Sequence, residues 1–213
     1  MASFNKGLHF ISGMLRAYFI VSPEHEPDRY KLVLENIKKF NDYKILCEWA
    51  TPGIAEKYGT GELSHKTKDG HVSVYMNYMN CLRDIRDNYT QGNFLIFESD
   101  AIFFDNFNEN IEKVVEIAKK IPNWGIINIG EGIGRPPWPP GIYKTPFNSC
   151  SEGIMWNYES ACKFLEFAEK CIDIPIDIKM EKCPGLDIYW LHPPLVYQGS
   201  IHKIFKSHDV NLQ

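Results

Sequence analysis

Short hydrophobic runs alternate with segments of helical periodicity along most of the chain. The runs that predict buried strands are residues 17–21, 43–49, 93–97, 124–129, 153–156, 186–190 and 195–197. Apolar residues recur every three or four positions between them, which predicts helices over residues 30–40, 71–88, 107–121 and 158–172. This alternation is typical of an α/β domain with a largely parallel central sheet. Such sheets bind ligands at the carboxyl ends of their strands.

One long segment, residues 130–151, interrupts the alternation. It is rich in proline and glycine and carries the aromatic residues Trp138, Tyr143 and Phe147. Long irregular loops inside a compact domain are usually either functional or disordered, and the aromatic content favours an ordered binding loop. Trp138 either stacks on a sugar or covers the core.

Composition and charge narrow the class of protein. The 213 residues are 44% hydrophobic and 23% charged, with a formal net charge of −4, which indicates a globular chain with a full core. The absence of basic runs argues against nucleic-acid binding, because phosphate neutralisation needs clustered Lys and Arg. The six cysteines form no CxxC pair, so we interpret them mostly as thiols. No apolar run is long enough for a membrane span or a signal peptide, so a cytoplasmic location is expected.

The most informative segment is an acidic turn that follows the strand at residues 93–97. Glu98 and Asp100 are spaced i, i+2 and share one side of an extended chain, while Ser99 faces the other side. Two carboxylates there suit Mg²⁺ or Mn²⁺, and the alternative is an ordinary polar turn. The apolar residues 101–104 favour the metal, because desolvated like charges are costly unless a cation neutralises them.

Other strand-end motifs match the chain less well. A haloacid-dehalogenase phosphatase needs Asp as its first acidic residue, and Glu98 stands there instead. A dinucleotide site needs GxGxxG after the first strand, and sugar-phosphate nucleotidyltransferases need a Gly-rich turn with Arg there; residues 22–24 read Ser-Pro-Glu. The remaining match is the DxD-type motif of nucleotide-sugar glycosyltransferases with the GT-A fold.

The order of four landmarks strengthens this match. The chain resembles glycosyltransferase family 25, the lipopolysaccharide and collagen galactosyltransferase type, from about residue 17 to 203. The resemblance is carried by residues 17–21 with 27–29, 97–101 with 124–130, 175–177 and 192–198. The chain departs from the family at Ser99, where the family has a carboxylate. The family's central GxxGCxxSH signature is echoed only faintly by residues 70–73.

The resemblance implies a fold and an activity. The implied fold is a GT-A-like, three-layer α/β/α sandwich with a mainly parallel, Rossmann-like central sheet. It forms one domain over residues 1–213, with a nucleotide-binding part at about 17–130 and an acceptor-binding part at about 131–203. The implied reaction is metal-dependent and inverting. It moves a sugar from a nucleotide-diphosphate donor, a UDP-sugar, to a hydroxyl of a glycan or glycoprotein.

The resemblance also suggests which residues hold the donor. Asp100 binds Mn²⁺ or Mg²⁺ directly, and Glu98 binds it through water or contacts the ribose. His202 is the candidate late metal ligand, with His208 in reserve, and Lys203 is a candidate contact to the diphosphate. The alternatives for the last residues are a surface histidine and a solvated lysine.

An inverting reaction needs a base that deprotonates the acceptor hydroxyl. Asp177 is the first candidate, and the alternative is that it caps a helix N-terminus. Glu152 is the second candidate base. Arg29 either holds the nucleotide or pairs with neighbouring acids on its helix.

Two broader alternatives stay open at this stage. The chain could be a non-catalytic carbohydrate-binding or assembly module that retains the fold, or one module of a larger polypeptide. In either case the shortage of positive charge predicts that phosphate binding requires a metal ion.

Overall fold

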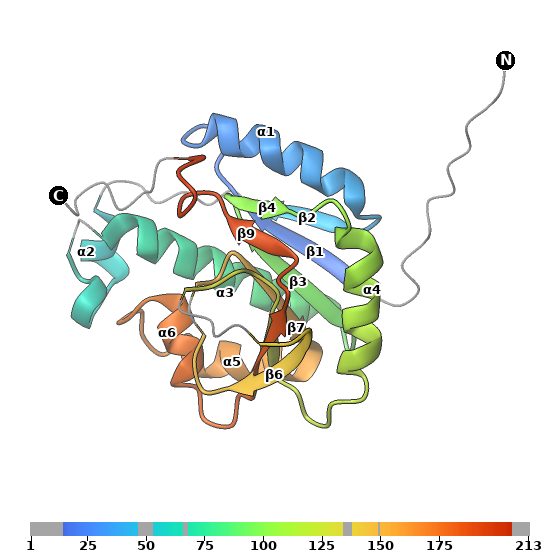
Figure 1. Cartoon of the computed structure of the whole chain (residues 1–213). Helices are drawn as coiled ribbons and strands as arrows, with labels where there is room; N and C mark the ends of the chain where they lie inside the picture. Colours follow the sequence, from blue (N-terminus) through green and yellow to red (C-terminus); the bar gives the residue numbers. More distant parts are fainter. Residues whose placement is uncertain (1–14, 47–52, 66–67, 134–137, 149, 206–213) are drawn as a thin grey trace, which may run out of the picture.

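The computed structural model describes residues 15–46, 53–65, 68–133, 138–148 and 150–205 (Figure 1). The strands are β1 (Leu15–Ile20), β2 (Tyr43–Leu46), β3 (Asn93–Glu98), β4 (Ala101–Phe103), β5 (Ile126–Asn128), β6 (Gly141–Thr145), β7 (Gly153–Asn157), β8 (Ile188–His192) and β9 (Val196–Gln198). The α-helices are α1 (Pro27–Asn36), α2 (Ile54–Tyr58), α3 (Asp69–Asn88), α4 (Phe107–Ala118), α5 (Tyr158–Ala168) and α6 (Ile176–Glu181), and the 3₁₀ turns are η1 (Ile37–Lys39) and η2 (Gly61–Leu63).

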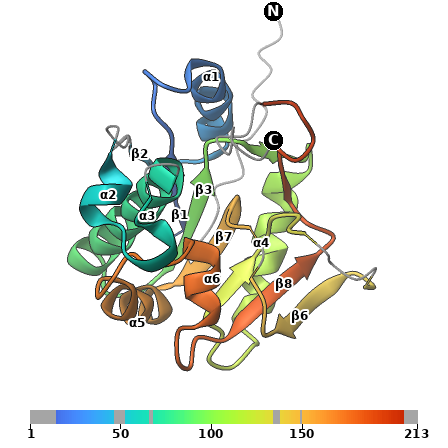
Figure 2. The ribbon, with the colours of Figure 1, turned by 90° about the vertical axis from the view of Figure 1, so that its left-hand side faces the viewer.

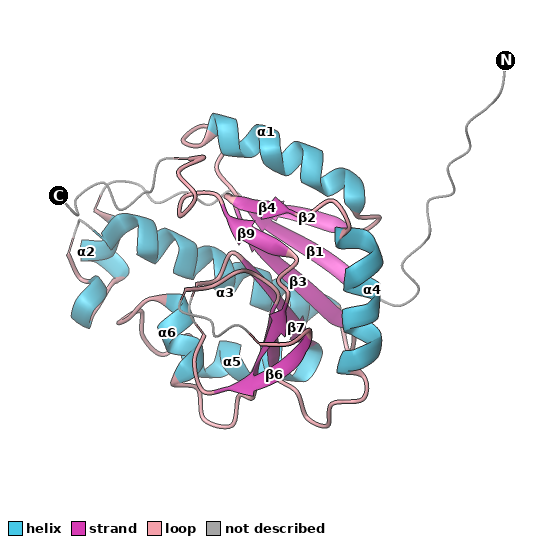
Figure 3. Ribbon diagram, in the orientation of Figure 1, coloured by secondary structure: helices cyan, strands magenta, loops and turns pink. Residues whose placement is uncertain are grey.

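Seven strands form the central sheet, in the order β2-β1-β3-β7-β5-β8-β6 (Figure 3). β1 pairs in parallel with β2 and β3, and β5 pairs in parallel with β8. β7 lies antiparallel between β3 and β5, and β6 lies antiparallel at the edge beside β8. Five strands therefore run in one direction and two run against them. A separate sheet pairs β4 with β9.

Successive side chains of a strand point to opposite faces of the sheet, and the strands of the central sheet bury side chains on both faces. Phe19 and Phe97 pack with residues of α1 and α4 in one core cluster, whereas Tyr18 and Ile96 pack with residues of α3, α5 and α6 in the other. Figure 2 shows α3 and α5 on one side of the sheet and α4 on the other. The central sheet is thus covered by helices on both faces, as expected for an α/β domain.

The sequence-based strands and helices are largely confirmed, with shifts of a few residues at their ends. Two short strands were not predicted: β4, within the apolar residues after the acidic turn, and β6, within the proline-rich segment 130–151. Trp138, from the same segment, packs against Tyr143 of β6 and Trp190 of β8, with ring centroids 4.8 and 6.0 Å apart. Its aromatic ring therefore covers the core here.

No disulfide joins the five cysteines within the described ranges, as expected for thiols, and Cys47 lies outside those ranges. In the described part of the chain, no helix combines the length and apolar character needed to cross a bilayer.

Candidate functional site

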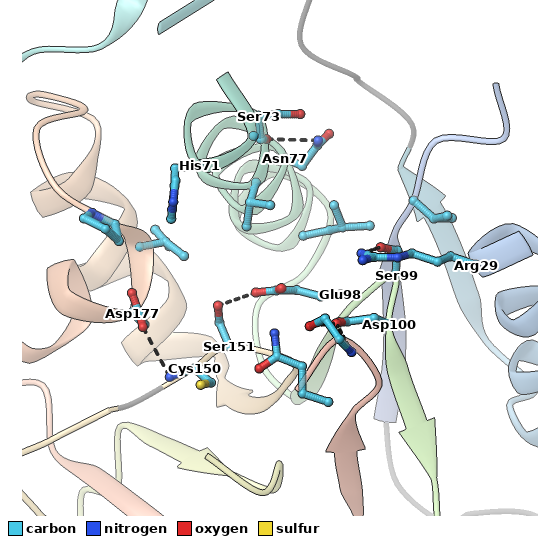
Figure 4. A pocket seen from close by; sticks show the side chains of 18 of the residues that line it. Arg29, His71, Ser73, Asn77, Glu98, Ser99, Asp100, Cys150, Ser151 and Asp177 are labelled. Atoms are coloured by element: carbon cyan, nitrogen blue, oxygen red, sulfur yellow. Dashed lines mark hydrogen bonds between the residues drawn. The ribbon is translucent and has the colours of Figure 1, made fainter. Parts of the chain in front are cut away.

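A cavity of about 300 Å³ opens where β1 and β3 end and β7 begins (Figure 4). Because β7 runs against β3, its first residues meet the carboxyl end of β3 at the same edge of the sheet. The N-terminal part of α3 and the start of α6 complete the wall. The polar residues that line it are Ser22, Glu26, Arg29, His71, Ser73, Asn77, Glu98, Ser99, Asp100, Cys150, Ser151, Asp177, Gln198 and Ser200.

Glu98 ends β3 and projects into the cavity, where the Ser151 hydroxyl donates a hydrogen bond to its Oε1 (Figure 4). Burial raises the pKa of Glu98 to about 8, with a further increase from the negative charge of Asp100, although the hydrogen bond from Ser151 opposes both effects. At neutral pH, and with no cation nearby, the carboxyl of Glu98 therefore largely keeps its proton.

Asp100 is only 2% exposed, and its two oxygens differ in their contacts. Oδ2 accepts hydrogen bonds from the backbone N–H of Ser200 at 3.1 Å and from its hydroxyl at 2.5 Å. Oδ1 is buried and accepts no hydrogen bond within the described ranges. A buried carboxylate oxygen without a partner is costly, so it indicates a position where a ligand is expected.

Gln198 presents a second oxygen of this kind at the same cavity. Its Oε1 is buried and has no hydrogen-bond partner among the residues that the structure describes. Sequence reasoning treated Gln198 only as part of the motif at residues 192–198. The local sequence pattern could not show that Gln198 lines this cavity, because its approach to Asp100 depends on the pairing of β4 with β9.

Arg29 lies at one end of the cavity in a buried network. Its Nη1 donates to Glu26 Oε1 at 3.2 Å and to Ser99 Oγ at 3.0 Å, and Ser99 donates to the same oxygen of Glu26 at 2.7 Å. Arg29 therefore pairs with a neighbouring acid, as one of the two sequence-based alternatives has it, and it also lines the cavity. Its contact with a nucleotide stays a prediction. Ser99 joins the network where the resemblance expects a carboxylate.

Asp177 lies at the opposite end, in the first turn of α6 (Figure 4). Its Oδ2 accepts from the Cys150 backbone N–H at 3.2 Å, and its Oδ1 accepts from the Ile178 backbone N–H at 2.9 Å. Pro175, and not Asp177, occupies the N-cap position of the helix. Asp177 therefore ties the start of α6 to the segment before β7 while its side chain lines the cavity.

The α3 wall was missed by sequence reasoning. His71, Ser73 and Asn77 line the cavity, whereas Tyr75 and Tyr78 on the same helix are fully buried in the core. The apolar stripe that contains these tyrosines therefore belongs to the core. Polar residues recurring at helical spacing beside that stripe were the available signal for a functional face.

The structure does not bring the remaining predicted site residues to the cavity. Glu152 is fully buried beside it, and its Oε1 accepts from the Gly132 backbone N–H at 3.0 Å. His202 is exposed and contacts Glu131 at 2.6 Å. Lys203 is exposed in the turn after β9, and His208 lies outside the described residues.

The charge of the described cavity wall is negative. Four carboxyl groups, those of Glu26, Glu98, Asp100 and Asp177, face a single guanidinium, that of Arg29. Within the described ranges, no three His, Cys, Asp or Glu side chains are grouped so that they could hold a metal ion by themselves. Any cation there needs other oxygen ligands, from amide groups, water or the substrate.

No protein-family model matches the chain, and no curated protein matches it in sequence.

Proposed function

We propose that the protein is a glycosyltransferase with a GT-A-like, three-layer fold that uses a nucleotide-diphosphate sugar and a divalent cation. The proposed donor is a UDP-sugar, and the acceptor is a hydroxyl of a glycan or glycoprotein. The observation that carries the proposal is the cavity at the carboxyl end of β3. Its wall contains Glu98 and Asp100, and a buried oxygen of Asp100 has no hydrogen-bond partner among the described residues.

The residues present fit Mn²⁺ or Mg²⁺, although the protein supplies only part of the ligand set. Both ions prefer oxygen ligands and commonly bind to one or two carboxylates together with waters and substrate phosphates. Asp100 would hold the ion, and Glu98 would bind it directly or through water. When bound, the cation stabilises the negative charge that develops on the leaving diphosphate. This arrangement accounts for phosphate binding in a cavity whose wall is negative.

Arg29 would contact the nucleotide from its end of the cavity. Arg29 is 8% exposed and its guanidinium is held by Glu26 and Ser99, so its position is fixed before the ligand arrives. A preorganised donor loses little side-chain entropy on binding, which makes its contribution larger than that of a mobile surface lysine.

Asp177 would act as the base toward the acceptor hydroxyl. Two backbone N–H groups donate to its carboxylate, so its orientation is fixed, and each oxygen keeps a lone pair for a substrate proton. Inversion requires the acceptor oxygen to attack from the side opposite the leaving group. Asp177 lies at the end of the cavity away from Arg29, which agrees with that requirement (Figure 4).

A module that binds donor or glycan without turnover is the second candidate. The hydrogen bonds to both oxygens of Asp177 favour it, because a purely structural carboxylate would be held in the same way. A module that binds the donor predicts the same UDP binding as the enzyme and differs from it in that the sugar is neither transferred nor hydrolysed.

Calorimetric titration of UDP tests the shared part of the proposal. We expect saturable binding with Mn²⁺ present and no measurable binding in EDTA. Asp100→Asn should remove most of the metal-dependent affinity, by about tenfold or more, since a charged ligand is replaced by a neutral one. Metal-independent binding, or equal affinity in the Asn variant, would contradict the assignment.

A second assay separates the enzyme from the binding module. Release of UDP from a panel of UDP-sugars, with and without glycan acceptors, should depend on Mn²⁺ if the protein is an enzyme. Asp177→Asn should then lower kcat strongly while leaving UDP affinity nearly unchanged. Binding of UDP without any turnover across the panel would favour the module.

A further inference from the structure

We propose that Gln198 is a metal ligand and that its side-chain oxygen, together with the carboxylate of Asp100, holds the divalent cation. This inference rests on the proposed function, since it concerns the same cavity. It replaces His202, which the family resemblance suggested for this role, with a neutral amide oxygen from the end of β9.

The pairing of β4 with β9 fixes Gln198 next to Asp100. Gln198 lies opposite Ala101 in the register, and the backbone N–H of Gly199 donates to the carbonyl oxygen of Asp100 at 2.9 Å. Ser200 then donates twice to Oδ2 of Asp100. These hydrogen bonds hold the backbone of Gln198 near that of Asp100. The two residues can separate only if the pairing of β4 with β9 is broken.

Two oxygens at this point remain without partners in the described part of the chain. They are Oδ1 of Asp100 and Oε1 of Gln198, and both are buried at the wall of the same cavity. A buried acceptor without a partner is costly, and the wall of this cavity carries two of them. A cation bound by both oxygens would remove both penalties.

The chemistry of the pair selects the kind of ion. Carboxylate and amide oxygens are hard ligands, which suit Mg²⁺, Mn²⁺ or Ca²⁺. An amide adds an oxygen without adding charge, which suits a wall that already carries Glu98 and Asp100. A ligand of another type also agrees with the finding that no three His, Cys, Asp or Glu side chains are grouped in the part of the chain that the structure describes.

His202 does not share this geometry. Its Nε2 contacts Oε2 of Glu131 at 2.6 Å, its side chain is 43% exposed, and it does not line the cavity. Its ring packs edge-on against Tyr197, with centroids 5.1 Å apart. It therefore supplies a matched control, because it lies only four residues from Gln198 in the same part of the chain.

Electron paramagnetic resonance of Mn²⁺ provides a readout that does not depend on activity. The signal of free Mn²⁺ is followed while the full-length protein is added, first with Mn²⁺ alone and then with UDP present. We expect Gln198→Leu to weaken Mn²⁺ binding at least tenfold. Gln198→Glu, which keeps an oxygen at the same position, should bind Mn²⁺ at least as tightly as the wild type. His202→Ala should leave the affinity unchanged.

Several results would overturn the inference. One is wild-type affinity in Gln198→Leu, and another is a loss in His202→Ala equal to the loss expected for Gln198→Leu. If Gln198→Leu does not fold, as judged by circular dichroism, Gln198→Glu decides alone, and weakened Mn²⁺ binding in that variant contradicts the proposal. A wild-type protein that leaves the Mn²⁺ signal unchanged at millimolar concentration, with and without UDP, also contradicts it.

The experiment separates this inference from the proposed function. If Mn²⁺ binds through Gln198 but UDP never binds, the metal site stands and the glycosyltransferase proposal fails. If UDP binding depends on Mn²⁺ but is indifferent to Gln198, the proposed function stands and the assignment of the ligand fails.

Discussion

At the scale of single residues, Cys150 occupies an unusual backbone conformation beside the cavity. Its φ of +67° lies in the left-handed region that residues other than glycine rarely adopt. Its N–H donates to Asp177, and its carbonyl accepts from the Asn128 side chain at 3.1 Å. Hydrogen bonds to both its N–H and its carbonyl thus hold this backbone conformation. Strained residues at functional sites persist in this way, because the surrounding structure fixes them.

Cys150→Gly should therefore stabilise the fold relative to Cys150→Ala, by about 1 kcal/mol. The alanine variant keeps the Cβ and with it the strain, whereas glycine adopts a positive φ without a steric penalty. Urea denaturation of the two variants measures the difference directly. Equal stability, or a more stable alanine variant, would show that the backbone here is not strained.

The carboxyl group of Asp84 makes stability depend on pH. It accepts from the Tyr18 hydroxyl at 2.7 Å and from Lys44 Nζ at 2.6 Å. Burial by itself raises the pKa of Asp84, but the hydrogen bonds from Lys44 and Tyr18 and the charges of Lys44 and Arg16 outweigh it, so the pKa lies below its usual value. The folded protein thus favours the ionised form of this group.

We expect Asp84→Asn to lower the free energy of unfolding at pH 7 by about 1 kcal/mol. Because the pKa is lowered in the folded state, the stabilisation is present above the unfolded value of about 3.9 and disappears as the pH falls through the folded value. Denaturation at pH 7 and in strong acid should show the two proteins converging. A difference that persists unchanged in acid would contradict this origin.

At the scale of elements, the start of β7 in the central sheet packs tightly against Val196 of β9 at Gly153. A Cβ added there would lie 2.6 Å from Val196 Cγ2 and 3.4 Å from Ile129 Cγ1 and Phe97 Cδ1. The absence of a side chain at Gly153 therefore lets β9 approach the start of β7. This contact also sets how near the end of β9 lies to the end of β3, and hence the shape of the cavity.

Gly153→Ala should destabilise the protein by about 1–3 kcal/mol through overpacking. The penalty should shrink in a Val196→Ala background, because that change removes the methyl group that the new Cβ would meet. A double-mutant cycle by thermal or urea denaturation gives the coupling. Strict additivity of the two changes would mean that the two sheets do not meet at this point.

The limits of sequence-based prediction also follow from the elements. The alternating and periodic patterns were strong in β1, β3, α3 and α4 because each buries a regular stripe or two faces, and these predictions are confirmed. β6 lies between proline-rich turns at the edge of the sheet, so its strand character comes from pairing with β8. The antiparallel direction of β7 has no local signal, because direction is decided by the neighbouring strands.

The same reasoning applies to the candidate site. Glu98 and Asp100 were identified in sequence because they directly follow a hydrophobic strand, and Arg29 and Asp177 because they lie in two of the landmarks that carry the family resemblance. Gln198, Ser151 and the polar face of α3 join them only through tertiary packing, which no local pattern encodes. His202 illustrates the opposite error, since a suitable residue type near the end of the chain lies away from the cavity in the fold.

At the scale of the whole molecule, the protein and its proposed diphosphate ligand both carry negative charge. The chain carries a formal charge of −4, and the described cavity wall has more carboxyl groups than cations. A nucleoside diphosphate is repelled by such a surface unless a bound cation changes the local sign. Binding of the nucleotide should therefore depend on the metal ion, because the cation offsets the repulsion between the diphosphate and the carboxyl groups of the wall.

Thermal unfolding can detect this dependence. UDP and Mn²⁺ together should raise Tm by about 5–10 °C when the ligand is near one hundred times its Kd, since such saturation adds about 2.7 kcal/mol. UDP alone in EDTA should leave Tm unchanged, and Mn²⁺ alone should raise it only slightly. Replacing UDP with uridine, which lacks the phosphates, controls for binding through the base and ribose. An equal shift with uridine would contradict a role for the metal.

The pairing of β4 with β9 joins parts of the chain that are made far apart in time. Asp100 and Ser200 are hydrogen-bonded although one hundred residues separate them in sequence. During synthesis at roughly 5–20 residues per second, the acidic turn therefore leaves the ribosome several seconds before the residues that cap it. The nascent chain then has Glu26, Glu98 and Asp100 but not the enclosure, so the proposed nucleotide site is complete only after β9 has been translated and has folded into place.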